Sequence, residues 1–266
     1  MTLLCIMDED STNWPKVIHC NSPGQRPGLD DYPNNCCLKG NNNTPMASPI
    51  TLTVCCLAGL PIWEQLAIEE SYLRKRTENV CLINEGSPPA IVMGISGQAE
   101  EHVHLGAAQE AACPVLRRFS GGGTVIVDES TLFVTFIFQK TSIDLGSSPE
   151  RIMQWTGGIY SQVFDAIPFA IHENDYVVYN RKFGGNAQYV TKTCWLHHTS
   201  FLWDYKPERM SLLKLPPKMP VYRQERPHDT FLQPLKEYYP SMGVIKERLL
   251  QVLTGQFDVC MRGVNV

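Results

Sequence analysis

Long apolar runs and an excess of basic residues are both missing from this sequence. No uninterrupted apolar run approaches the ~20 residues that a bilayer-spanning helix requires, and the most apolar stretch, residues 132–138, has only the length of a strand. The chain has 23 Lys and Arg against 27 Asp and Glu, for a formal net charge of −4. Bulk nucleic-acid binding requires a basic face. These absences argue against a membrane protein and against a nucleic-acid-binding protein.

Cysteines at metal-binding spacing are missing as well. The chain has ten cysteines but no CxxC sequence, whereas zinc sites use closely spaced ligand pairs and disulfide frameworks belong to short secreted chains. We therefore predict reduced thiols, in the cytoplasm or in mitochondria. No clear targeting segment is present, because Asp8, Glu9 and Asp10 lie where a mitochondrial transit peptide would be poor in acids.

The chain divides by composition into three parts. Residues 1–48 contain NNCC, GNNNTP and several Gly or Pro breaks without a hydrophobic period, which predicts a disordered extension. Residues 49–256 are regular and long enough for one domain. Residues 257–266 are expected to form a tail, and we expect no accessory domain after the last helix.

Amphipathic segments and β-branched or aromatic runs are interspersed along residues 49–256. The amphipathic segments predict helices at 62–76, 98–111 and 244–253, and another that begins at Ser148-Pro149. The runs predict strands at 50–57, 80–83, 90–93, 176–179, 183–190 and 195–203. Because strands occur in succession as well as in alternation with helices, we predict an α+β domain with a mixed β-sheet flanked by helices.

The sequence RRFSGGGTVIVD, residues 117–128, is the densest candidate for a binding site. Three successive glycines allow the backbone to approach a ligand closely and to turn amide N–H groups toward an anion. Arg118 could then hold phosphate or carboxylate oxygens. The segment is not a P-loop, since GxxxxGK[ST] is absent. The alternative is a plain glycine hairpin with solvated arginines.

Two further segments carry groups suited to chemistry. Asp175 and Lys182 lie at the two ends of one hairpin arm, where they could serve Mg²⁺ and a phosphoryl oxygen respectively, or form only a surface ion pair. In WLHHTS, the adjacent His197 and His198 should point to opposite faces of a strand, so they cannot easily bind one metal. We expect one of these two histidines to belong to the core or to support the site indirectly.

Together, and in this order, these segments resemble the motifs of the lipoate–protein ligase family. RRFSGGGTVIVD resembles RRxSGGGxVxHD, RKFGGNAQ resembles RKxSGxA, and LHHTSFL resembles HHGTLL; PIWEQLAIEE and NDYVV also resemble family segments. The resemblance covers residues 50–254. It implies a biotin-ligase-like, class II synthetase-like catalytic domain. It also implies a ligase that uses ATP and Mg²⁺ to attach lipoate or octanoate to a lysine of lipoyl domains, in 2-oxoacid dehydrogenase subunits and the glycine cleavage H protein.

The resemblance also implies roles for particular residues. Lys182 would be the catalytic residue, bridging the acyl carbonyl and the α-phosphate, and Asp175 would bind Mg²⁺ beside the phosphate. The residues implied to contact ATP or the acyl-adenylate are Arg118, Ser120, Gly121, Gly122, Gly123, Thr124, Val125, Ile126, Asp175 and Lys182. Apolar residues around Val125 and Val134 are expected to line a slot for the C8 chain.

Five residues depart from the family motifs. Val127 stands in place of a histidine, Ser130-Thr131 in place of Gly-Asn, Gly184 in place of a serine and Thr199 in place of a glycine. A non-catalytic, acyl-binding descendant of the ligases is therefore one alternative. Another is an octanoyl or lipoyl transferase, but such enzymes carry a cysteine nucleophile shortly before the RK strand, and residues 168–172 contain none. Biotin–protein ligase is disfavoured because its GRGRxGR loop is absent. A separate accessory-domain protein is expected as a partner for adenylation.

Overall fold

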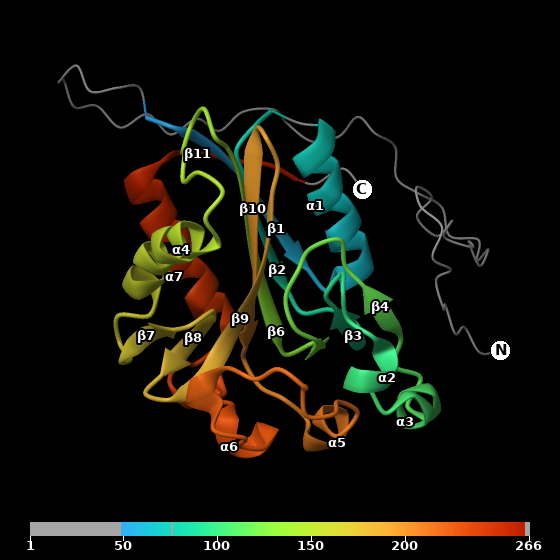
Figure 1. Cartoon of the computed structure of the whole chain (residues 1–266). Helices are drawn as coiled ribbons and strands as arrows, with labels where there is room; N and C mark the ends of the chain where they lie inside the picture. Colours follow the sequence, from blue (N-terminus) through green and yellow to red (C-terminus); the bar gives the residue numbers. More distant parts are fainter. Residues whose placement is uncertain (1–48, 76, 264–266) are drawn as a thin grey trace, which may run out of the picture.

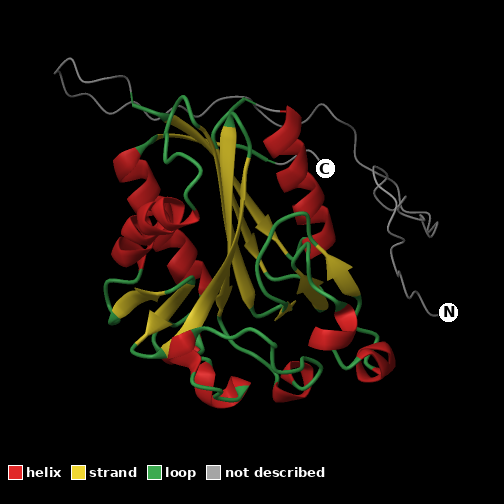
Figure 2. Ribbon diagram, in the orientation of Figure 1, coloured by secondary structure: helices red, strands yellow, loops and turns green. Residues whose placement is uncertain are grey.

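The computed structural model describes residues 49–75 and 77–263, so the extension predicted for residues 1–48 lies outside the described residues. An eight-stranded mixed sheet runs through the centre (Figures 1 and 2). In spatial order its strands are β11 (Asp258–Met261), β1 (Thr51–Ala58), β2 (Val80–Glu85), β6 (Thr131–Gln139), β10 (Cys194–Leu202), β9 (Arg181–Val190), β8 (Asp175–Val178) and β7 (Phe169–His172). The order shows that strands distant in sequence become neighbours.

Parallel and antiparallel pairings occupy different parts of this sheet. β1 pairs in parallel with both β2 and β11, whereas every pair from β2 through β6, β10, β9 and β8 to β7 is antiparallel. The β8–β9 ladder has a register shift between Tyr176 and Val177. Such irregularities redirect side chains locally, and this one lies between the two candidate site residues Asp175 and Lys182.

Helices cover both faces of the large sheet (Figure 1). α4 (Pro149–Val163) and α7 (Met242–Gln256) pack on one face, over a core that includes Phe136, Trp195 and Tyr160. α1 (Ile62–Lys75) packs on the other face through Ile62, Leu66 and Leu73. Ser148 caps α4, because its side chain accepts from Arg151 N and Pro149 occupies the first turn.

A second, three-stranded sheet lies on the α1 side of the molecule. It consists of β4 (Val115–Arg117), β3 (Ala90–Met93) and β5 (Val125–Val127), with β3 in the middle. Val92 and Val127 share a core with Phe133 of β6, which anchors the small sheet to the large one. The glycine loop connects β4 to β5 and is therefore fixed at both ends.

Short helical turns complete the fold. They are α2 (Ala99–His102), α3 (Leu105–Glu110), α5 (Pro207–Met210), η1 (Val221–Arg223), α6 (His228–Phe231) and η2 (Leu235–Glu237). The predicted helix at 98–111 is thus two short helices, because Val103 has an extended conformation and forms a β-bridge with Leu213.

The α+β class with a mixed sheet flanked by helices is confirmed. The prediction of a tail from residue 257 was wrong for Asp258–Met261, which form β11 beside β1. The reason is tertiary: these residues extend an edge that residues 51–54 leave open. None of the helices described is long and apolar enough to cross a membrane.

Candidate active site

An open groove lies where β5, β6, β9 and β10 meet residues 210–232. Its volume is about 640 Å³, counted with its mouth. Most of the wall is apolar, formed by Val125, Ile126, Phe183, Phe201, Leu202, Met210, Leu213, Phe231 and Leu232. Lys182, Arg223 and His228 add basic groups, and Thr124 adds a hydroxyl. A mainly apolar groove with a few charged groups suits a ligand with an apolar chain and an anionic end.

The predicted contact residues divide into two groups in space. Those that line the groove are Thr124, Val125, Ile126 and Lys182. Those that lie outside its lining are Arg118, Ser120, Gly121, Gly122, Gly123 and Asp175. Of the apolar residues expected around Val125 and Val134, Val125 and Ile126 line the groove, whereas Val134 is fully buried in the core beneath α4, on the other face of the sheet from α1.

Arg118 holds the glycine loop together from inside. Its guanidinium donates to the carbonyls of Gly121 and Gly123, each at 2.9 Å from Nη2, and to that of Val92 at 3.3 Å from Nη1. Burial lowers the pKa of Arg118 to about 10, with the charge of Glu69 acting in the opposite direction. In this arrangement Arg118 shapes the loop, whereas the sequence predicted a direct hold on phosphate.

The glycine at position 122 is required by this packing. Gly122 has a φ of +110°, which side chains rarely adopt, and a Cβ there would lie 2.6 Å from Arg118 Nη2. The carbonyl of Gly122 also packs against Gly94, where a Cβ would lie 2.1 Å from that oxygen. Gly123, by contrast, has open space around its Cα.

Lys182 and Asp175 meet across the β8–β9 hairpin. The Nζ of Lys182 lies 2.7 Å from Oδ1 of Asp175, and the Tyr222 hydroxyl donates to Oδ2 at 2.8 Å. Asp175 is buried, whereas the Lys182 side chain keeps 24% of its surface exposed and lines the groove. Gly185 leaves room for this side chain, because a Cβ there would lie 3.1 Å from Nζ. The ammonium therefore faces the groove while a carboxylate holds it in place.

The surroundings of Asp175 do not fit a protein-held Mg²⁺. Both of its oxygens already accept, one from an ammonium and one from a hydroxyl. Across residues 49–75 and 77–263, no group of three or more His, Cys, Asp or Glu side chains is placed to bind a metal. Mg²⁺ usually keeps several waters and is shared with substrate phosphates. The donor set around Asp175 therefore does not provide a magnesium site of the chain's own.

Residues 221–231 contribute site residues that sequence reasoning missed. Tyr222 holds Asp175, and burial followed by the charge of Asp175 raises the pKa of the Tyr222 hydroxyl. Arg223 is 5% exposed and its guanidinium carbon lies 4.5 Å from the centre of the Phe231 ring. The signal in the sequence was weak: three basic residues in YRQERPH, without any helical or strand period.

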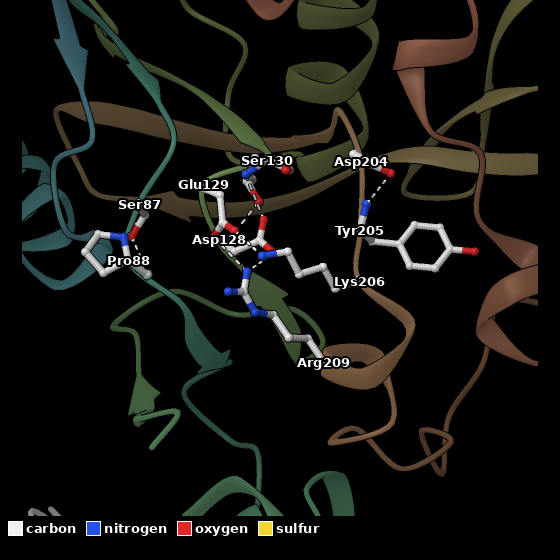
Figure 3. Close-up of polar contacts among 10 residues, drawn as sticks. Ser87, Pro88, Asp128, Glu129, Ser130, Asp204, Tyr205, Lys206 and Arg209 are labelled. Atoms are coloured by element: carbon white, nitrogen blue, oxygen red, sulfur yellow. Dashed lines mark hydrogen bonds and ion pairs between the residues drawn. The ribbon is translucent and has the colours of Figure 1, made fainter. Parts of the chain in front are cut away.

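Ion pairs fasten α5 beside the groove (Figure 3). Nη1 of Arg209 lies 2.6 Å from Oδ2 of Asp128 and 2.7 Å from Oε2 of Glu129. Lys206 reaches the other oxygen of Glu129 at 2.6 Å. Hydrogen bonds from Arg209 lower the pKa of Glu129 to about 2. These contacts hold Met210, at the end of α5, in the wall of the groove.

The paired histidines point to opposite faces of β10, as predicted. His197 faces α4, where its Nε2 lies 2.9 Å from the Tyr176 hydroxyl and 3.3 Å from that of Thr156. His198 faces α1, where its Nδ1 lies 2.8 Å from a Glu69 oxygen. Neither histidine lines the groove. Both are buried polar groups of the core.

The departures from the family motifs have local explanations. Val127 is buried against the core of the small sheet, where an apolar side chain is accommodated. A Cβ on Gly184 would lie 2.9 Å from the Phe201 ring, so a serine would require that ring to shift. Thr199 accepts a hydrogen bond from the Tyr160 hydroxyl at 3.1 Å. The hairpin still presents Lys182 to the groove.

Comparison with known protein families shows to which family this chain belongs. The family model described as the lipoyl protein ligase A/B catalytic domain matches residues 61–254. The chain belongs to this family. This range includes the glycine loop, the Asp175–Lys182 hairpin, the histidine strand and the newly found residues 221–231.

Curated relatives carry related descriptions. The chain is 29% identical over 194 residues to an inactive lipoate–protein ligase 2 of Plasmodium falciparum, covering 59% of this chain and 50% of that protein. It is also 29% identical over 150 residues to a lipoate–protein ligase of Bacillus subtilis, covering 52% of this chain and 42% of that protein. The chain thus spans about half or less of the length of these relatives.

Solved structures support the fold. The first is a bi-partite lipoate protein ligase from Thermoplasma acidophilum, with a TM-score of 0.68, 16% identity, and coverage of 83% of this chain and 88% of that one. A lipoate–protein ligase A bound with ATP gives a TM-score of 0.66 at 15% identity, with 83% and 90% coverage. At these identities the likeness establishes the fold of the lipoate ligases.

Proposed function

We propose that this chain activates lipoate or octanoate with ATP and transfers the acyl group to a lysine of a lipoyl domain. The observation that supports it best is the position of Lys182, partly exposed in a mainly apolar groove and held by Asp175. Such an arrangement offers a fixed positive charge at one place along an apolar wall. The ligand implied is an acyl chain that ends in a carboxylate or an acyl phosphate.

In the first step a carboxylate oxygen of the acyl substrate attacks the α-phosphorus of ATP. The bond between the α-phosphorus and the bridging oxygen breaks, and pyrophosphate leaves with its electron pair. Negative charge grows on the phosphoryl oxygens, and Lys182 is the groove cation assigned to stabilise it. The glycine loop would contribute backbone N–H groups, in the shape that Arg118 maintains.

In the second step the amine of the acceptor lysine attacks the carbonyl carbon of the acyl-adenylate. A tetrahedral oxyanion forms, collapses to the amide and releases AMP, while the amine loses a proton to solvent. Lys182 would stabilise the oxyanion and then the departing phosphate. The open groove mouth leaves the acyl-adenylate accessible to an acceptor domain.

Cysteine chemistry is less well supported. Cys194 is buried, and its sulfur donates to the Leu73 carbonyl at 3.4 Å, on the side of α1. Burial raises the pKa of Cys113, which disfavours the thiolate that a transferase requires. No cysteine among the described residues lines the groove.

A non-catalytic, acyl-binding protein is the second candidate, because one similar curated protein is described as an inactive ligase. The two candidates differ in ATP–pyrophosphate exchange, which only an adenylating enzyme performs. Purified chain, ATP, Mg²⁺ and lipoate should give lipoate-dependent exchange, and addition of a lipoyl domain should give an acylated lysine detectable by mass spectrometry. Lipoate binding without exchange would refute the proposed function and support the second candidate.

The acceptor and an accessory partner also belong to this proposal. One structural relative is described as a bi-partite ligase studied with its E2 lipoyl domain. For this chain we propose lipoyl domains of 2-oxoacid dehydrogenases or the H protein as acceptors. We further propose that a separate protein assists adenylation, so that transfer from preformed lipoyl-AMP is faster than ligation from lipoate and ATP. Equal rates from the two starting points, without added protein, would contradict this part.

A further inference from the structure

Arg223 carries a buried donor that has no acceptor within the described part of the chain. Its Nε donates to the Arg226 carbonyl at 2.9 Å, whereas its Nη2 is buried and unpaired. The residue is 5% exposed, lines the groove and stacks on Phe231. A buried unpaired donor on a charged group is costly, so such an atom calls for an explanation.

A second unpaired donor lines the same groove. The hydroxyl of Thr124, directly after the glycine loop, is buried and has no partner in residues 49–75 and 77–263. Arg223 and Thr124 come from segments about 100 residues apart, so each is an independent observation.

The electrostatics around these donors favour an anion. Asp175 is the nearby carboxylate, but its two oxygens accept from Lys182 and Tyr222. Burial lowers the pKa of His228, and the charges of Arg223 and Lys182 lower it further. These two cations therefore act on the same part of the groove, and both disfavour a positive charge on the His228 imidazole.

We propose that Arg223 binds a phosphate oxygen of the nucleotide, so that the groove holds this anion through η1 as well as through Lys182 of β9. The choice of a nucleotide rests on the proposed function. The planar guanidinium presents a fork that matches two phosphate oxygens, and Phe231 keeps its plane fixed. Thr124 would donate a further hydrogen bond from the end of the glycine loop.

Arg226 provides a matched control. It lies three residues further along and donates only to backbone carbonyls, those of Arg223, Asn180 and Tyr222. Its role is to hold the 221–226 turn. Arg226→Met should therefore lower the melting temperature. Arg223→Met loses one hydrogen bond, from Nε to the Arg226 carbonyl, but keeps an unbranched apolar stem on Phe231 and removes an unpaired buried donor, so its melting temperature should fall by a few degrees at most.

The test measures binding of AMP, adenosine and octanoate by calorimetry to the full chain. In Arg223→Met, the Kd for AMP should rise about 10- to 100-fold, as for loss of a charged hydrogen bond. Adenosine and octanoate should bind as in wild type, and Arg223→Lys should recover part of the AMP affinity. These results together would support a phosphate contact.

Several outcomes would overturn it. An equal loss of AMP and adenosine binding in Arg223→Met would indicate a structural effect on the groove. Weaker octanoate binding with unchanged AMP binding would assign Arg223 to a carboxylate instead. If Arg223→Met binds AMP with unchanged affinity while the wild-type chain shows ligase activity, this inference is refuted and the proposed function is not. Arg223-dependent AMP binding in a chain without pyrophosphate exchange would refute the proposed function alone.

Discussion

Acidification is expected to destabilise this fold through His197. The residue is fully buried, and burial lowers its pKa from 6.5 to about 3, with the charge of His198 as a lesser cause. Its Nε2 is engaged by the Tyr176 hydroxyl, and its Nδ1 has no partner among the described residues. A proton added to this ring would therefore gain no acceptor.

The direction of this pH effect depends on whether the folded or the unfolded chain binds the proton. Between pH 6.5 and pH 3, an unfolded chain protonates this histidine and the folded chain does not. The free energy of unfolding therefore falls as the pH falls through this window. With a slope of about 1.4 kcal/mol per pH unit, the histidine contributes a loss of roughly 2 kcal/mol between pH 7 and pH 5.

The assay is urea unfolding of the wild type and of His197→Gln at both pH values. Glutamine retains a polar group near the Tyr176 hydroxyl but has no titration in this range. The His197→Gln variant will be less stable than wild type at both pH values. The quantity compared is therefore the change in unfolding free energy of each protein from pH 7 to pH 5. Wild type should lose about 2 kcal/mol more than the variant from pH 7 to pH 5. Equal losses in both proteins would refute the argument that His197 is held neutral by burial.

Three further predictions concern the site. Lys182→Ala should fold normally but lose roughly 10²–10³ in the rate of acyl transfer, measured with lipoyl-AMP and a lipoyl domain; near-wild-type transfer would remove the assigned role. Cys194→Ser and Cys113→Ser should remain active with modest losses of stability, and an acyl thioester on either cysteine would contradict this. Gly122→Ala should cost roughly 1–3 kcal/mol of unfolding free energy, because of its positive φ and close contacts, while Gly123→Ala, with open space around it, should cost much less. Similar losses for the two alanine variants in thermal unfolding would show that the loop is not packed as described.

Local patterns in the sequence were enough to predict the longer helices and several of the strands. α1 was predicted at 62–76 and is observed at Ile62–Lys75, and β3 was predicted with its observed bounds, Ala90–Met93. The start of α4 at Ser148-Pro149 was also confirmed. These elements carry their signals in consecutive residues, through helical period, capping residues or a β-branched run.

The motif residues were identifiable for the same reason, but their contacts were not. Glycines and cations in succession marked the loop and the hairpin, and the family resemblance supplied the roles expected of them. The sequence could not show that Arg118 turns inward to the loop carbonyls or that Asp175 is shared by Lys182 and Tyr222. Such choices depend on which acceptors lie within hydrogen-bonding distance after packing.

The tertiary structure alone decided which residues complete the groove and the sheet edge. Arg223 and Phe231 come from a segment without periodicity, and they enter the site because chain segments distant in sequence pack together. Asp258–Met261 are a strand because β1 offers an unpaired edge. The sequence by itself determined the family, the α+β class and the motif residues, since each depends on neighbours along the chain. Groove membership, hydrogen-bond partners and the last strand depend on neighbours in space, which the fold alone specifies.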